Sequence, residues 1–324
     1  MSALLEIEHL SVTFGGRTAA VRAASLRVER GETHCLVGES GCGKSVTALA
    51  VMGLLGRGGE RSARRMSFAG HDLASLSDRG MARIRGNRMA MIFQEPMTSL
   101  NPAFTVGSQM AEVLTRHKRA SRAAALERAV ELMARVGITA PELRLGQFPH
   151  QLSGGLRQRV MIAMALMCDP ELLIADEPTT ALDVTVQAQI LRLLATLKRE
   201  FGLAILLITH DLGIVARLGD RVSVMYAGAV VEHAPAADLF RSPQHPYTRG
   251  LLSCVPVPGR VRRDRPLGSI AGVVPSIAPG FAGCAFRSRC QHADAACQRQ
   301  IPHRQASAAH HYVCRLAPSA RGEP

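Results

Sequence analysis

The chain has 324 residues, of which 47% are hydrophobic and 20% charged, and its formal net charge is +13. This balance predicts a globular protein with room for one large domain and an extension, or for two modest domains. The sequence also excludes a membrane-spanning chain, because its longest apolar runs are far shorter than the roughly 20 residues that cross a bilayer. These runs are residues 160–168 and 202–209. The N-terminus lacks a basic stretch followed by an apolar core, so we expect no secretory signal and a cytoplasmic protein.

The first third of the chain predicts strands around a glycine-rich turn. Apolar and polar residues alternate in LLEIEHLSVTF (4–14) and AASLRVERGE (23–32), which indicates strands. THCLVG (33–38) is a short strand, and KSVTALAVMGLL (44–55) is a helix closed by glycines. Short strands and turns then continue to MAMIF (89–93).

A helix-rich block is predicted over about residues 95–168, and its clearest helix lies within residues 120–138. Three apolar strands follow, at residues 171–176, 203–209 and 221–228, with a helix between the first two. This alternation predicts an α/β fold with a parallel sheet covered by helices.

The composition changes near Phe240, beyond which prolines, arginines, histidines and cysteines show weak periodicity. We therefore expect residues 241–324 to form an extension that is irregular except where something staples it. Its four cysteines are spaced C-x5-C-x6-C-x16-C, which in a reducing compartment favours metal over disulfides. Four thiolates can hold a [4Fe–4S] cluster or a tetrahedral Zn²⁺, and unligated thiols are the third reading. The residues are Cys284, Cys290, Cys297 and Cys314.

GESGCGKS (38–45) fits the pattern G-x-x-x-x-G-K-[ST] and lies between a predicted strand and helix. Glycines let the backbone turn tightly and aim its N–H groups inward, and the helix adds its positive dipole end. Lys44 is predicted to reach the β- and γ-phosphates of ATP, and Ser45 to ligate Mg²⁺. The ATP-binding residues are Gly38, Glu39, Ser40, Gly41, Cys42, Gly43, Lys44 and Ser45.

Polar side chains end three apolar strands, at the edge where ligands bind in parallel sheets. Asp176 suits a Mg²⁺ shell, and Glu177 suits a general base for the attacking water. Gln94 and His210 end two other strands, and alone each is a weak signal. QLSGGLRQRV (151–160) predicts a second anion-binding helix start, which in isolation reads as an ordinary N-cap.

The order and spacing of these segments resemble the ATP-binding subunits of ABC transporters over about residues 4–240. The resemblance implies a P-loop ATP-binding domain at 1–240, with a mixed sheet core, an antiparallel β subdomain and a helical subdomain inserted at about 95–168. It implies that Phe14 stacks on adenine, although a core strand residue is an equal alternative. It assigns catalysis to Lys44, Gln94, Glu177 and His210, Mg²⁺ to Ser45, Gln94 and Asp176, and contact with the partner's ATP to Ser153, Gly154, Gly155 and Asp183. Leu156 departs from the glutamine common at that position.

In this family two such domains stack head to tail around ATP, and this chain carries one phosphate loop and one L-S-G-G sequence. We therefore expect a second ATP-binding subunit, a paralogue, and two permease subunits at the cytoplasmic face of a bacterial inner membrane. SPQHPYTRGLL (242–252), MTSLNP (97–102) and AGVVPS (271–276) resemble the oligopeptide and dipeptide importers. An extracytoplasmic peptide-binding protein then acts indirectly. Similar dipeptide-type subunits carry an iron–sulfur cluster, so we expect [4Fe–4S], with Zn²⁺ as the runner-up.

Two other functions remain open from the residues. A nucleic-acid or ribosome ATPase suits the basic charge, but the chain lacks the paired ATP domains or long coiled coil usual there, so no nucleic acid is expected. A purely regulatory subunit is disfavoured because Glu177 and His210 are both present. The substrate stays open among dipeptides, longer peptides, nickel, haem and glutathione.

Overall fold

The computed structural model describes residues 3–16, 18–95, 99–180, 182–255 and 268–318. Its contacts divide the chain into two compact units. Residues 97–98 of MTSLNP lie outside the described residues, as does residue 181, two positions before Asp183. Unit 1 comprises Met1–Val28, Glu32–Ser75 and Ile208–Pro324, and unit 2 comprises Glu29–Gly31 and Leu76–Leu207.

Unit 1 begins with an antiparallel sheet in the order β2-β1-β5-β6, in which β4 also pairs with β1. Burial largely alternates along β1 and β2, as the period-two pattern predicted, although β2 begins at Thr18 and ends at Val28 whereas the predicted strand was 23–32. Helix α1 (Lys44–Met52) follows the glycine-rich turn and ends at Gly53 in the left-handed conformation. The strands are β1 (Leu5–Phe14), β2 (Thr18–Val28), β4 (Gly59–Ser62), β5 (Arg65–Phe68) and β6 (His71–Asp72).

A second set of strands in unit 1 has the order β12-β13-β11-β10-β3, in which β12 is His303–Ser307 and β13 is His310–Val313. All residues of β3 (Thr33–Val37) are buried, and β3 runs parallel to β10 (Arg221–Tyr226). β11 (Ala229–Pro235) is antiparallel to β10, so the strands are mixed in direction. Short helices accompany them: α9 (Leu212–Leu218), α10 (Ala236–Arg241) and α11 (Pro246–Ser253).

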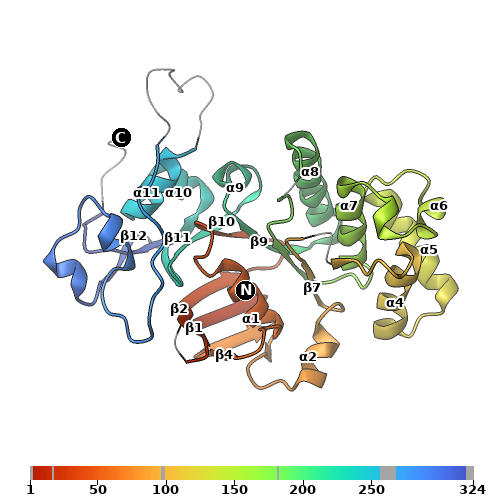
Figure 1. The fold of residues 1–324 in the computed structure, drawn as a ribbon, viewed down its shortest axis with the longest axis horizontal. Helices are drawn as coiled ribbons and strands as arrows, with labels where there is room; N and C mark the ends of the chain where they lie inside the picture. The colour runs from red at the N-terminus through yellow and green to blue at the C-terminus, as the bar shows by residue number, and fades with distance from the viewer. Residues whose placement is uncertain (1–2, 17, 96–98, 181, 256–267, 319–324) are drawn as a thin grey trace. The chain divides into compact units, whose positions relative to one another are not determined.

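The extension contains more regular structure than its weak periodicity predicted. Its strand β13 (His310–Val313) pairs with β11 and places Tyr312 opposite Glu232, while β12 (His303–Ser307) pairs with β13 (Figure 1). The 3₁₀ turns η2 (Ala285–Arg289) and η3 (Ala295–Gln298) carry the cysteine-rich segment. Strand pairing with β11 therefore ties the extension to the sheet.

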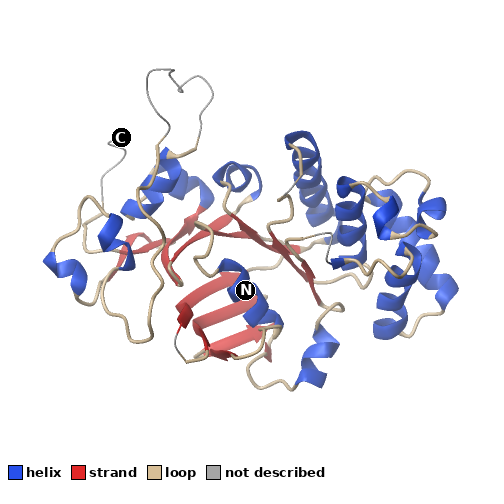
Figure 2. Ribbon diagram, viewed as in Figure 1, coloured by secondary structure: helices blue, strands red, loops and turns tan. Residues whose placement is uncertain are grey.

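Unit 2 contains the parallel pair β7 (Met89–Ile92) and β8 (Leu172–Asp176) and the first part of β9 (Ala204–Thr209). Four of its helices gather with no strand among them, which matches the predicted helical block (Figure 2). They are α4 (Val106–Lys118), α5 (Arg122–Arg135), α6 (Pro141–Leu145) and α7 (Gly154–Ala165). The unit also contains α2 (Asp78–Ile84), α8 (Val184–Phe201) and the 3₁₀ turn η1 (Pro149–Gln151). No helix in the described ranges has the length and apolarity to cross a membrane.

Candidate functional site

The glycine-rich turn of unit 1 admits only glycine at two positions. Gly38 has φ of 154°, and a Cβ added there would lie 2.2 Å from the Met225 carbonyl oxygen. Gly43 has φ of 105°, and its added Cβ would lie 2.4 Å from the Ala20 carbonyl oxygen. Backbone closeness, and not flexibility alone, therefore requires glycine in this loop.

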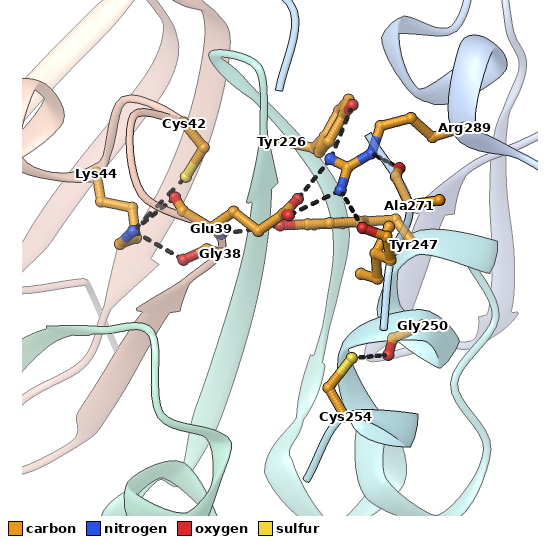
Figure 3. A network of polar contacts seen from close by, with 11 residues as sticks. Gly38, Glu39, Cys42, Lys44, Tyr226, Tyr247, Gly250, Cys254, Ala271 and Arg289 are labelled. Carbon is orange, nitrogen blue, oxygen red and sulfur yellow. Dashed lines mark hydrogen bonds and ion pairs between the residues drawn. The ribbon is translucent and has the colours of Figure 1, made fainter. Parts of the chain in front are cut away.

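Lys44 opens α1 and is buried, with 5% of its surface exposed. Its Nζ donates to the carbonyl oxygens of Gly38 at 2.8 Å and Glu39 at 3.0 Å (Figure 3). Burial raises the pKa of the neighbouring Cys42 thiol, and Lys44 acts in the opposite direction. The loop thus holds its ammonium group at the N-terminal end of a helix, which is the arrangement that binds phosphate.

Glu39 is held by the C-terminal extension, a contact that the sequence patterns did not predict. Arg289 binds its carboxylate through two hydrogen bonds, Nη1 to Oε2 at 2.7 Å and Nη2 to Oε1 at 2.9 Å (Figure 3). The Glu39 N–H donates to the Tyr247 hydroxyl at 2.9 Å. These bonds to Glu39 raise the pKa of Arg289, and burial raises the pKa of Tyr247. An acidic residue within a loop predicted to bind an anion was the signal that a cation should lie nearby.

The strand-end residues of unit 2 form a small hydrogen-bonded group. Asp176 ends β8 and is 4% exposed. Glu177 follows with φ of 45°, and its Oε2 accepts from Thr180 Oγ1 at 2.9 Å and from Gln94 Nε2 at 3.3 Å. The structure therefore brings Gln94 and Glu177 together, from strands that are neighbours in the sheet, and holds the Glu177 carboxylate from two sides.

The L-S-G-G segment also lies in unit 2, where Ser153 caps α7 by accepting from the Leu156 N–H at 3.4 Å. Asp183 caps α8 in the same way, accepting from the Val186 N–H at 2.9 Å. A Cβ added at Gly155 would lie 3.1 Å from Val186, so the two helix starts adjoin. Ser153, Gly154 and Asp183 are exposed. Both N-termini therefore have open surface within unit 2.

The remaining predicted residues lie in unit 1. Phe14 ends β1 and is half-buried beside Gly59, whose added Cβ would lie 2.9 Å from its ring. His210 directly follows β9 and is exposed. Unit 1 thus contains the glycine-rich loop at residues 38–45, Phe14 and His210, and unit 2 contains Gln94, Ser153, Gly154, Gly155, Asp176, Glu177 and Asp183.

The four extension cysteines line one cavity of unit 1, whose volume is about 10 Å³. Burial raises the pKa of Cys284, Cys290 and Cys314, and neighbouring thiols of the set raise each further. All four are free thiols. Within the described ranges no three His, Cys, Asp or Glu side chains are spaced to hold a metal ion. The structure therefore brings the predicted donors together without showing a metal-binding spacing.

Comparison with known proteins agrees with these observations. A family model described as ABC transporter matches residues 21–180, and one described as oligopeptide/dipeptide transporter, C-terminal region, matches residues 231–297. A solved dimeric ATP-binding cassette in a post-hydrolysis state, bound to ADP and Pi, has a TM-score of 0.64 at 26% identity, covering 72% of this chain and 98% of that chain. The expected fold is thereby confirmed.

Whole-chain relatives lead to the same family. A probable peptide ABC transporter ATP-binding protein of Sinorhizobium fredii is 53% identical over 92% of this chain and 90% of its own length. Dipeptide transport ATP-binding proteins of Bacillus subtilis and Haemophilus influenzae are 48% and 46% identical, covering 93% and 99% of this chain and 91% and 98% of their own lengths. The chain therefore belongs to the ATP-binding subunits of ABC transporters, in the branch that carries the oligopeptide/dipeptide transporter C-terminal region.

Proposed function

We propose that this chain is the ATP-hydrolysing subunit that powers import of di- or oligopeptides through a membrane permease. The single observation that carries the proposal is the match to peptide-transport ATP-binding proteins along almost the whole chain, extension included. The geometry of the loop at residues 38–45 supports it, since the turn requires glycine at two positions and holds Lys44 at a helix start.

In the proposed reaction, the backbone N–H groups of the loop and Lys44 bind the phosphates of ATP. Ser45, Gln94 and Asp176 would hold Mg²⁺, which neutralises charge on the phosphates when bound. Glu177 orients the attacking water and accepts its proton, and Thr180 and Gln94 fix the direction of its carboxylate. We assign His210 to the γ-phosphate and Phe14 to the adenine ring.

A second ATP-binding subunit, a paralogue in our proposal, completes the site. Ser153, Gly154, Gly155 and Asp183 would contact the partner's nucleotide, and the two exposed, adjoining helix starts are suited to a triphosphate because each adds positive potential. Val184, at the start of α8, is 81% exposed and offers apolar surface to the same partner.

Two permease subunits at the cytoplasmic face of the inner membrane are the further partners, and an extracytoplasmic peptide-binding protein delivers the substrate. Unit 2 carries exposed apolar side chains suited to the permease contact: Phe93 at 40%, Phe104 at 54% and Leu143 at 77%. The net charge of +13 suits anionic lipid headgroups next to that contact.

We also propose that the cysteine cavity takes a [4Fe–4S] cluster, with Zn²⁺ as the alternative. The donor set supports this, because four thiols of the right chemistry converge on one cavity. Arg287 and Arg315 line the same cavity and would offset the negative charge of ligated thiolates. The iron, sulfide and zinc content of anaerobically purified protein tests the assignment, and metal-free protein with full nucleotide binding would refute it.

The proposed function is tested by co-expressing the chain with candidate permease subunits, a second ATP-binding subunit and a peptide-binding protein, and by measuring ATP-driven peptide uptake in proteoliposomes. Glu177→Gln should abolish hydrolysis and uptake and leave ATP binding intact, because only the base is lost. Near-normal hydrolysis by this variant would remove Glu177 from the mechanism. Uptake that ignores peptides and follows nickel or haem would refute the substrate class.

A further inference from the structure

Arg289 joins the C-terminal extension to the phosphate loop, although 250 residues separate it from Glu39 in sequence. Its side chain is 4% exposed, and that of Glu39 is 28% exposed. Two parallel N–H to oxygen bonds form the pair, which is the strongest arrangement available to a guanidinium and a carboxylate. The contact is therefore partly buried, and solvent screens it less than a fully exposed ion pair.

The remaining donors of Arg289 fix its position in the extension. Its Nε donates to the Ala271 carbonyl oxygen at 2.7 Å, and Nη2 also donates to the Ile270 carbonyl oxygen at 3.0 Å. The guanidinium lies 5.8 Å from the centre of the Tyr226 ring and 5.9 Å from that of Phe286. Backbone and aromatic contacts thus fix the position of the guanidinium independently of its contact with Glu39.

Glu39 is bound to the extension at a second point and to Lys44 at a third. Its N–H donates to Tyr247, which packs against Tyr226 and Phe286 with ring centres 4.6 Å and 5.3 Å apart. Its carbonyl oxygen accepts from Lys44, the residue assigned to the phosphates. The conformation of the loop at residues 38–39 is therefore set jointly by the extension and by Lys44.

A carboxylate is electrostatically adverse in a loop that receives a triphosphate, because like charges repel strongly at short range. Arg289 neutralises the charge of the Glu39 carboxylate by direct contact with both of its oxygens. We propose that Arg289 is a positioning residue for ATP binding, which neutralises Glu39 and holds the phosphate loop, so that the extension sets the nucleotide affinity of this chain. The inference rests on the proposed function, since it takes residues 38–45 as the phosphate loop.

The position of Arg289 gives the extension a means of control. Arg289 is the last residue of η2, and Cys284 and Cys290 flank that turn on its two sides. Both cysteines line the cavity formed with Cys297 and Cys314. A change in the ligation of these cysteines would therefore act directly on η2, the turn that places Arg289 against the loop.

The test is isothermal titration of the purified full chain with AMP-PNP and Mg²⁺. Arg289→Met should weaken binding about tenfold, because it leaves the Glu39 charge uncompensated beside the phosphates. Glu39→Gln added to Arg289→Met should restore binding to within about threefold of the wild type, since the adverse charge is then gone. The matched control is Arg241→Met, which changes an exposed arginine at the end of α10, away from the cysteine cavity, and should stay within about twofold.

Wild-type affinity in Arg289→Met, or no recovery in the double variant, would overturn the proposal. Should Arg289→Met fail to fold, Tyr247→Phe replaces it. That change removes only the hydroxyl that accepts from Glu39, and it should speed hydrogen exchange of residues 38–45 and weaken AMP-PNP binding; no change in either would also overturn the proposal. Lys44→Ala distinguishes failure of the phosphate-loop assignment from failure of the Arg289 proposal. If this variant binds AMP-PNP as tightly as the wild type, the phosphate-loop assignment is refuted, and the inference with it.

Discussion

Glu232 on β11 anchors the extension, and its removal is expected to release that segment. The side chain is fully buried, with 0% of its surface exposed. Oε1 accepts from the Gln244 N–H and from His310 Nε2, both at 2.7 Å, and Oε2 accepts from the His245 N–H at 2.8 Å. One carboxylate therefore satisfies the start of α11 and the start of β13 together.

Glu232→Gln keeps the size of the side chain but replaces one acceptor oxygen with an NH₂ group that faces an N–H donor. A buried donor is left unpaired, and two hydrogen bonds lose their charge, which together cost about 3 kcal/mol. Because 1.4 kcal/mol is a factor of ten, residues 242–254 and 303–314 should exchange amide hydrogens about 100-fold faster.

Hydrogen-exchange mass spectrometry measures this effect segment by segment, so it does not depend on two-state unfolding of the whole chain. Glu127→Gln is the matched control, since Glu127 is an exposed glutamate on α5, where such a change costs less than about 0.5 kcal/mol. If Glu232→Gln leaves exchange in both segments within about threefold of this control, the anchoring role of the carboxylate is refuted.

Three further outcomes are expected. Gly43→Ala should abolish nucleotide binding, because its Cβ would lie 2.4 Å from the Ala20 carbonyl oxygen. At Gly41 an added Cβ meets only open space, so Gly41→Ala suffers backbone strain alone and should bind nucleotide more tightly than Gly43→Ala. If titration gives the reverse order of affinities, the steric argument is contradicted. Burial lowers the pKa of His34 to about 3 and of His245 to about 4, below the value of about 6.5 in an unfolded chain, so the unfolded state takes up more protons and stability should fall as the pH drops below about 6.5. At pH 5 each histidine should lower the free energy of unfolding by about 2 kcal/mol. Equal free energies of urea unfolding at pH 7.5 and pH 5 would count against this prediction. Ser153→Arg should leave AMP-PNP binding on this chain intact and reduce transport by the assembled complex at least about tenfold, while unchanged transport would exclude a role at the partner's nucleotide.

Local sequence determined the glycine-rich loop at residues 38–45 and most of the strands. Glycine spacing followed by lysine and serine specifies a turn into a helix within eight residues, and the period-two pattern predicted β1 and β2. Buried strands such as β8 and β9 were predicted because a short, continuous apolar run bounded by polar residues is typical of a fully buried strand. These features depend on neighbours in the chain, so a single sequence contains the information for them.

The tertiary structure alone decided which distant residues meet. Nothing in the spacing paired Arg289 with Glu39, Glu232 with His310, or Gly43 with the Ala20 carbonyl. A charge that folding buries must find a partner, but its sequence position does not say which one, because chain packing brings together residues that no local period relates. The predicted irregular extension became an edge of the sheet for the same reason: β13 is stabilised by pairing with β11, which only folding places beside it.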